Sequence, residues 1–205
     1  MKIAIIGSGN VGGALAQQWV KAGHTVLVGA KFPLSEKNIA LATQIGEDRF
    51  APVASAVGQC DVVLIATPPA AIFEVIEAMG DVAGKVLIDA TNAVQKKPEP
   101  FPTVYHALAE RTSGASVVKC FNTTGFENMA NPRYGSEAAD MFMAGDSPEA
   151  KQVARQLALD AGFAACYDFG DGSRVQLLEQ FALSWINLAI FQGMGRGVAF
   201  KLMRR

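Results

Sequence analysis

Hydrophobic and polar positions alternate in blocks along this chain. Short apolar runs, rich in Val and Ile, are separated by turns and by stretches with helical spacing. Because these runs are too short for free-standing helices, they predict buried β-strands. Such strands are expected at 2–7, 25–30, 61–67, 85–91 and 116–122, with two further edge strands at 140–145 and 164–170.

The stretches between the strands repeat their apolar side chains at the spacing of a helix face. Helices are expected at 10–22, 70–79, 104–110 and 147–159. The last of these opens with Ser147 and Pro148, an N-cap residue followed by Pro at the first helical position. Strands joined by helical crossovers predict an α/β fold, a doubly wound and mostly parallel sheet with helices on both faces.

The pattern changes after Asp171. Residues 173–192 predict one long helix that is apolar nearly all round, followed by a glycine break and a short last helix. A helix of this kind is buried, either across its own domain or against another subunit. We therefore expect a dinucleotide-binding domain at 1–171 and a C-terminal helical extension at 172–205 that closes the site and contributes to a homodimer. The polar, Pro-rich segment 92–102 is expected to be a loop.

A glycine pattern follows the first predicted strand directly. Gly7, Gly9 and Gly12 fit G-x-G-x-x-G between an apolar strand and a helical period. In a Rossmann-type turn, the first glycine permits the tight turn, the second admits a pyrophosphate, and the third lets helix and strand pack closely. The helix N-terminus then offers N–H groups to the phosphates. The alternative is a glycine-rich turn without a ligand.

The end of the second strand indicates which dinucleotide is bound. An NAD site usually has Asp or Glu about 20 residues after the glycines. This chain has Ala30 and Lys31 there, and no acid before Glu36. The small residue leaves room for a 2′-phosphate and the lysine supplies a charge for it, so NADP(H) is the predicted cofactor. An ordinary surface lysine is the other interpretation of Lys31.

Polar residues also follow three other strands. Because ligands of open parallel sheets lie at the carboxyl ends of the strands, these residues are expected to contact ribose, pyrophosphate or the nicotinamide carboxamide. Turn chemistry would equally explain their presence. They are Thr67, Pro68, Thr91, Asn92 and Asn122.

Catalytic side chains are not assignable from the sequence. His24 and His106 favour structural roles at or within helices, no Tyr is followed by Lys four residues on, and no spacing indicates a metal site. Carbonyl reduction generally needs a proton donor beside the substrate oxygen. A hydride acceptor that needs no such donor, for example a flavin-like ring stacked on the nicotinamide, agrees better with the side chains in this sequence.

Charge and hydropathy narrow the class of protein further. The 205 residues carry a net charge of −1 without a long basic block, which argues against a nucleic-acid partner. The apolar stretch 180–195 contains Gln, Ser and Asn and is too short to span a membrane. The N-terminus has the pattern of a strand and not of a leader, so a cytoplasmic protein is expected. Cys60, Cys120 and Cys166 are expected to be buried free thiols.

Three segments resemble the NADPH-dependent coenzyme F420 reductase family. They are MKIAIIGSGNVGGALAQQWVKAGHTVLVGAK, MFMAGDSPEAKQVARQLALDAGF and WINLAIFQGMGRGVAFKLMRR. The resemblance implies hydride transfer between NADP and an 8-hydroxy-5-deazaflavin. Carried over by position, it implies that the NADP phosphates are bound by Ser8, Asn10, Val11, Ala30 and Lys31.

The resemblance also assigns the other half of the site. Thr67 and Pro68 would line the nicotinamide half, and Gly193, Met194 and Gly195 would lie where the two rings meet. The family usually has Ser then Arg at positions 30 and 31, so this chain lacks a hydroxyl and a planar guanidinium there.

Three functions therefore remain open. The first is an NADP-dependent oxidoreductase with a deazaflavin or flavin acceptor; the same domain type resembles the cytoplasmic portion of membrane metalloreductases, whose acceptor is a flavin. The second is an NADP-binding sensor without turnover. The third is a small imino- or hydroxyacid reductase, although those proteins usually append a helical domain of about 100 residues or more.

Overall fold

The computed structural model describes residues 1–33, 35–94 and 96–205. Gln95, within the loop predicted at 92–102, lies outside the described residues. The other residues of that segment form neither helix nor strand.

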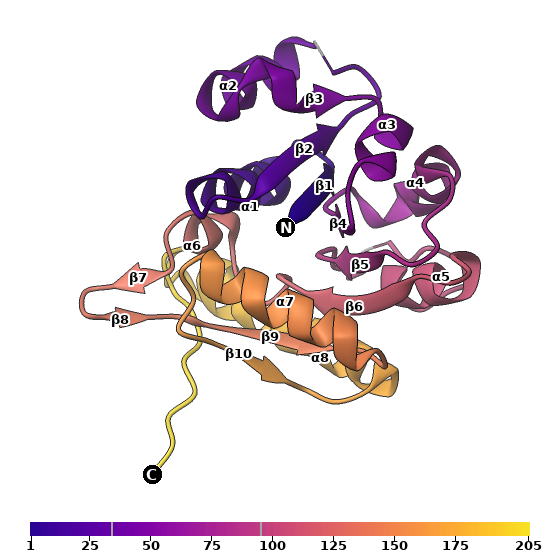
Figure 1. Cartoon of the computed structure of the whole chain (residues 1–205). Coiled ribbons are helices and arrows are strands. Elements are labelled where there is room, and N and C mark those ends of the chain that lie inside the picture. Colours follow the sequence, from indigo (N-terminus) through magenta and orange to yellow (C-terminus); the bar gives the residue numbers. More distant parts are fainter. Residues whose placement is uncertain (34, 95) are drawn as a thin grey trace.

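One eight-stranded sheet organises the chain (Figure 1). Its strand order is β10-β9-β6-β5-β4-β1-β2-β3, and each pairing is parallel except that of β6 with β9. The predicted fold class, a doubly wound and mostly parallel sheet, is confirmed. The strands are β1 (Lys2–Ile6), β2 (Thr25–Gly29), β3 (Phe50–Ala51), β4 (Val62–Ile65), β5 (Val86–Asp89), β6 (Ser116–Cys120), β9 (Asp140–Ala144) and β10 (Ala165–Asp168).

The prediction of β9 as an edge strand is wrong. After β6 the chain forms the short helix α6 (Phe126–Ala130) and a hairpin of β7 (Arg133–Tyr134) and β8 (Glu137–Ala138). It then returns antiparallel to β6, so β9 lies between β6 and β10. All five residues of β9 are buried, which explains why the four that follow Asp140 form an apolar run.

Helices cover both faces of this sheet, as the crossovers predict (Figure 1). One face carries α1 (Asn10–Lys21), α2 (Glu36–Ile45), α6 and α7 (Pro148–Asp160). The other carries α3 (Val53–Gly58), α4 (Ile72–Met79), α5 (Val104–Arg111) and α8 (Val175–Ile186). Single 3₁₀ turns lie at Glu47–Arg49, Pro69–Ala71 and Gly172–Arg174.

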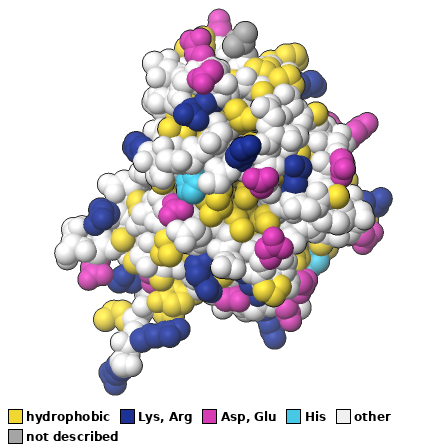
Figure 2. Space-filling view, in the orientation of Figure 1, with side chains coloured by type: hydrophobic (Ala, Val, Ile, Leu, Met, Phe, Trp, Pro, Cys, Tyr) yellow, Lys and Arg dark blue, Asp and Glu magenta, His cyan; other side chains and the backbone are white. Residues whose placement is uncertain are grey.

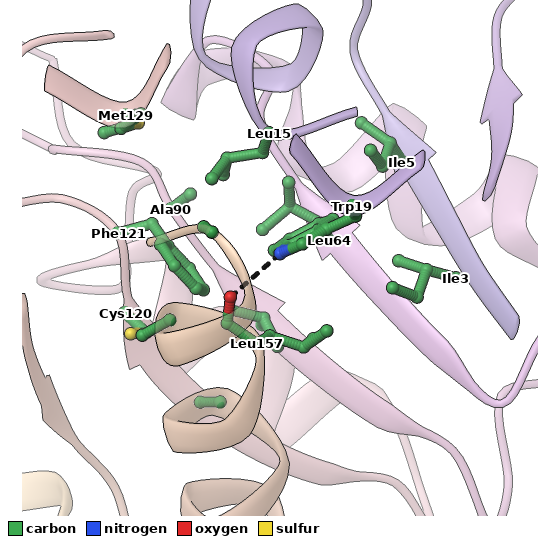
Figure 3. Packing of buried hydrophobic residues seen from close by; sticks show 14 of the residues in the cluster. Ile3, Ile5, Leu15, Trp19, Leu64, Ala90, Cys120, Phe121, Met129 and Leu157 are labelled. Atoms are coloured by element: carbon green, nitrogen blue, oxygen red, sulfur yellow. Dashed lines mark hydrogen bonds between the residues drawn. The ribbon is translucent and has the colours of Figure 1, made fainter. Parts of the chain in front are cut away.

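The core on the first face is centred on Trp19 of α1, which is fully buried (Figure 3). Its indole Nε1 donates a hydrogen bond of 2.9 Å to the carbonyl of Leu157 in α7. Its ring meets Phe121 edge-on, with centroids 5.6 Å apart. Trp19 therefore joins α1, α7 and the residue that follows β6 in one packed unit.

The C-terminal segment departs from its prediction in two ways. The long helix is present as α8, continued by a π-helical turn at Asn187–Phe191, but the expected short last helix is wrong. Residues 198–205 are instead extended, because the tail bonds to β9: the Asp140 N–H donates to Phe200 O at 3.0 Å, and Leu202 N–H donates to Asp140 Oδ2 at 2.7 Å. The end of the tail leaves the body of the molecule (Figure 1).

The second departure concerns burial. The sequence predicts that the long helix is buried on all sides, yet Leu177 is 53% exposed and Phe191 is 74% exposed in this single chain. Only the side that carries Leu178, Ala182 and Trp185 is packed against the sheet and its neighbours. An apolar face of this segment is thus left uncovered.

Other sequence expectations concern the surface and the thiols. Acidic and basic side chains are interspersed on the face shown in Figure 2. No helix among the described residues combines the length and apolar character that a membrane crossing requires. Cys60, Cys120 and Cys166 are buried free thiols, as predicted, and burial raises the pKa of the Cys60 and Cys120 thiols.

Candidate functional site

The turn between β1 and α1 has a backbone that only glycine accommodates. Gly7 has a φ of +113°, and a Cβ added there would lie 2.6 Å from Ala66 O. A Cβ on Gly12 would lie 1.9 Å from Gly7 O. Both glycines are therefore required by contacts within the chain, and Gly12 lets α1 pack directly on the turn.

Gly9 is different, because a Cβ there would meet no heavy atom within 4 Å. It is the N-cap of α1, with φ −71° and ψ −170°, a conformation open to any residue. Its side-chain position faces open space at the N-terminus of a 12-residue helix. That space is where an anion would meet the first N–H groups of the helix.

A cleft runs along the carboxyl ends of the central strands. It consists of two adjoining cavities that share Gly7, Ser8 and Thr67. The β2-side cavity, of about 590 Å³, lies between the ends of β1 and β2 and helices α3 and α4. The β5-side cavity, of about 490 Å³, is lined by the turn that follows β1 and by the loops that follow β4 and β5.

Most of the predicted binding residues line this cleft. They are Gly7, Ser8, Gly9, Asn10, Val11, Ala30, Lys31, Thr67, Pro68, Thr91 and Asn92. Gly12 is buried beneath the turn, and Asn122 lies behind the wall of the β5-side cavity, where its Nδ2 donates to Asn92 Oδ1 at 3.0 Å. Their part in binding stays a prediction.

The three predicted acceptor residues lie elsewhere. Gly193, Met194 and Gly195 follow the π-helical turn, are exposed, and do not line the cleft. Their segment folds back on that turn, with the Gly195 N–H donating to Ala189 O at 3.1 Å. The two histidines also play no part in the lining: His24 pairs with Asp160 at 2.9 Å, and His106 bonds to Thr103 Oγ1 at 2.7 Å.

A buried ionic cluster, here termed the Lys119 cluster, consists of Asp89, Lys119 and Glu179. Lys119 Nζ on β6 donates to Asp89 Oδ2 at 2.8 Å and to Glu179 Oε1 at 2.6 Å. Its third bond, of 2.6 Å, goes to the carbonyl oxygen of Thr91. Because Lys119 has three protons and three acceptors, the ammonium is fully satisfied although its side chain is 0% exposed.

The Lys119 cluster holds the wall of the β5-side cavity in place. Thr91 N–H donates to Asp89 Oδ1 at 2.9 Å, and Ala93 N–H donates to Glu179 Oε2 at 3.2 Å. The loop after β5 is therefore tied to α8 through side chains. Burial raises the pKa of Glu179, and the nearby Lys119 ammonium opposes this rise.

The end of β6 carries backbone strain. Phe121, which is fully buried, has a φ of +62°, the left-handed region that non-glycine residues rarely adopt. Strain of this kind costs on the order of 1–3 kcal/mol and persists only where packing enforces it, as the Trp19 contact does here. The turn at Phe121 directs Asn122 toward Asn92 in the cleft wall.

The sequence interpretation missed the Lys119 cluster. A signal was present, because Asp89 and Lys119 stand inside apolar runs predicted as buried strands, and Glu179 stands in a predicted buried helix. Charged residues are almost never fully buried unless they are paired. Their charged partners, 30 and 60 residues away along the chain, could be identified only from the fold.

The described residues fit a dinucleotide in two respects. Gly9 leaves open the space at the helix N-terminus that a Cβ would fill. In addition, the buried oxygens Thr67 Oγ1, Thr91 Oγ1 and Asn122 Oδ1, at or behind the cleft wall, have no hydrogen-bond partner among the described residues. Buried polar atoms without partners are uncommon and are typical of sites that await a ligand.

A glycine turn and helix N-terminus at the carboxyl edge of a doubly wound sheet are typical of dinucleotide-binding proteins with a Rossmann-type fold. Within that class, residues 2–93 match the model of the family described as NADP oxidoreductase, coenzyme F420-dependent. The resemblance inferred from the sequence is confirmed over this part of the chain. The match supports NADP(H) as the dinucleotide and oxidoreduction as the function.

Two solved structures are similar over the whole chain. One is a proposed F420-dependent NADP reductase from Arthrobacter, with a TM-score of 0.86, 24% identity and full coverage of both chains. The other is a hypothetical protein from Sinorhizobium meliloti, with a TM-score of 0.74 and 26% identity, covering 100% of this chain and 96% of that one. These likenesses establish the shared fold.

Two other similar proteins are longer than this chain. The rat metalloreductase STEAP3 is 27% identical over 164 residues, which are 79% of this chain and 32% of that protein. The chain thus spans about a third of the relative's length. A reductive aminase from Aspergillus terreus, solved with NADPH, has a TM-score of 0.70 and 22% identity, with 62% of its chain covered. It shares the fold.

We expect Gly9→Ala to separate folding from nucleotide binding. The new methyl group meets no protein atom, so the unfolding free energy should stay within about 0.5 kcal/mol of wild type. The same methyl group occupies the space at the helix N-terminus, so the NADPH dissociation constant should rise at least about tenfold. Urea unfolding and calorimetric titration measure the two effects. Gly58→Ala, also without a neighbour within 4 Å but outside the cleft, should change neither.

Lys119→Met should destabilise the protein in a pH-dependent manner. Removal of the ammonium leaves two buried carboxylates without their cation, at a cost of about 3–5 kcal/mol near neutral pH. The pKa of Glu179, already raised by burial, then rises further, so the folded state binds a proton that the unfolded state has released. Stability therefore falls as pH rises, and the deficit should be smaller at about pH 5 than at about pH 7.5.

Urea unfolding followed by circular dichroism at both pH values checks this expectation. The matched control is Lys151→Met, which breaks the more exposed pair of Lys151 with Asp168 and should cost at most about 1 kcal/mol at either pH. A deficit for Lys119→Met that is equal at the two pH values would contradict the assignment of Glu179 as its source.

Proposed function

We propose that this protein transfers a hydride between NADPH and a deazaflavin or flavin-like ring bound beside the nicotinamide. The adenosine half of NADP(H) would lie in the β2-side cavity and the nicotinamide half in the β5-side cavity, with the pyrophosphate at the shared turn. This placement is supported by the strand order, because β1 is flanked by β2 on one side and by β4 and β5 on the other.

The 2′-phosphate of NADP(H) would be held at the end of β2. Ala30 and Lys31 line the β2-side cavity, and the ammonium of the exposed Lys31 lies 6.0 Å from the centroid of the Phe32 ring, within the same cavity lining. The Phe32 ring, 67% exposed at the same cavity, offers a flat apolar surface. Glu74 on α4 also lines this cavity, so the cavity carries side chains of both charges. Lys31 is the lining residue that would favour a phosphate.

One observation carries the proposal for a ring acceptor. None of the described residues that line the β5-side cavity has an ionisable side chain. Reduction of a carbonyl or imine would need a proton donor near the substrate, whereas a flavin-like ring takes the hydride into its own conjugated system. NADPH supplies the hydride and leaves as NADP⁺, and the reduced ring takes its proton from solvent. The chain would align the rings and exclude water.

We expect Lys31→Glu to reverse the preference for NADPH over NADH. The substitution replaces attraction to the 2′-phosphate by repulsion, so the NADPH dissociation constant should rise at least about tenfold at low ionic strength. NADH, which lacks the phosphate, should bind with nearly unchanged affinity. Lys21→Glu makes the same change of charge at the end of α1, outside the cleft, and serves as the control. Equal losses for both nucleotides would argue against a phosphate contact.

Turnover tests the acceptor directly. Purified protein is mixed with NADPH and with coenzyme F420, FMN or a cyclic imine in separate reactions, and the near-ultraviolet absorbance of NADPH is followed. We expect NADPH to be consumed with at least one of the two rings, and Gly9→Ala to slow this consumption at NADPH concentrations below saturation. Tight NADPH binding without consumption would favour a sensor module, and consumption only with a cyclic imine would favour an imine reductase.

We also propose that two chains associate through the uncovered apolar face of α8 and the π-helical turn. Leu177, Ile190, Phe191 and Met194 are exposed on this segment. A second copy would cover them and bring its own segment 193–195 close to the first. Light scattering after size exclusion should give twice the mass of one chain, and Phe191→Asp should halve it. A monomer in the wild type would contradict this proposal.

A further inference from the structure

The Lys119 cluster carries a surplus of negative charge. Asp89 and Glu179 provide two carboxylates and Lys119 one ammonium, and all three groups are buried. Each carboxylate accepts one bond from Lys119 and a second from a backbone N–H, of Thr91 or Ala93. All four oxygens thus act as acceptors, which is the arrangement of two ionised carboxylates.

This surplus charge lies behind the β5-side cavity. The cluster bonds directly to the backbone at Thr91 and Ala93, on either side of Asn92 in the cavity wall. Because the described lining residues of that cavity have no ionisable side chain, the cavity itself supplies no countercharge. In a buried region of low permittivity, a fixed charge acts over a longer distance than it does in water.

We propose that the Lys119 cluster is an electrostatic device that stabilises the oxidised, positively charged nicotinamide and so favours hydride donation by NADPH. The nicotinamide ring is cationic in NADP⁺ and neutral in NADPH, whereas the phosphates have the same charge in both. A negative charge near the ring therefore discriminates between the two oxidation states. This inference rests on the proposed NADP site, and it makes Glu179 a positioning residue that also sets the potential of the bound cofactor.

The test compares the affinities of NADP⁺ and NADPH, measured by calorimetry at about pH 8. A pH well above the ordinary carboxyl range is chosen because burial raises the pKa of Glu179. In the wild type, NADP⁺ should bind at least as tightly as NADPH. Glu179→Gln keeps an oxygen for Lys119 but removes the surplus charge. We expect it to raise the ratio of the NADP⁺ to the NADPH dissociation constant about tenfold, a shift of the bound couple to a more positive potential.

Two further variants separate charge from structure. Glu179→Asp keeps the charge but shortens the side chain, so it should weaken both nucleotides equally and leave the ratio unchanged. Asp89→Asn removes a charge at the other carboxylate and should raise the ratio as Glu179→Gln does; it also replaces that variant if Glu179→Gln fails to fold. Glu110→Gln, an exposed change on α5, controls for a loss of charge far from the cleft.

The outcomes are distinguishable. An unchanged ratio in Glu179→Gln or Asp89→Asn, with both nucleotides still bound, overturns the electrostatic role and leaves the NADP site intact. A wild-type preference of about tenfold or more for NADPH overturns it as well, whether or not the variants fold. Failure of the wild type to bind either nucleotide would instead refute the proposed function.

Discussion

The close contact between α1 and the turn that follows β1 is the constraint on which the rest of this structure depends. With a Cβ position on Gly12 only 1.9 Å from Gly7 O, no larger residue could hold the helix in this place. That placement directs the helix N-terminus at the cleft and at the same time brings Trp19 against Leu157 and Phe121. Folding and the candidate site therefore share one steric requirement, whereas Gly9, alone of the three glycines, has open space at its Cβ position.

Two other features at the same edge of the sheet are unfavourable in isolation. The Lys119 cluster removes three charges from water, and Phe121 adopts a left-handed backbone. Each is held by the surrounding packing. The Lys119 cluster bonds to the backbone on either side of Asn92, and Asn122, which follows Phe121, bonds to Asn92 itself. This concentration of buried charge and strain around one segment of the cleft wall is what a site that holds its geometry before ligand binding would require.

The sequence predicted those features that depend on neighbouring residues. The apolar runs of β1, β2, β4, β5 and β6, and the glycine turn, follow from local pattern and steric need, so they could be placed without the fold. The interior position of β9 could not, because it results from a long-range antiparallel pairing with β6. The short β3 and the helix α3 had too few residues for a recognisable period.

The candidate site shows the same difference between features set by neighbouring residues and features set by distant ones. Lys31, Thr67 and Asn92 were accessible to prediction, because residues directly after parallel strands meet at one edge. The partners of Lys119 were not, since a charge within an apolar run shows that a countercharge exists without showing where it lies. The extended tail was missed because its conformation depends on bonds to Asp140 of β9 and not on its own pattern.

Hydrogen–deuterium exchange with and without NADPH would show where on the chain the nucleotide binds. We predict slower exchange in residues 7–13, 29–31, 66–69 and 90–93, the segments that surround the two halves of the cleft, and no change in the β7–β8 hairpin. Protection confined to segments outside the cleft, or none under saturating NADPH, would contradict it.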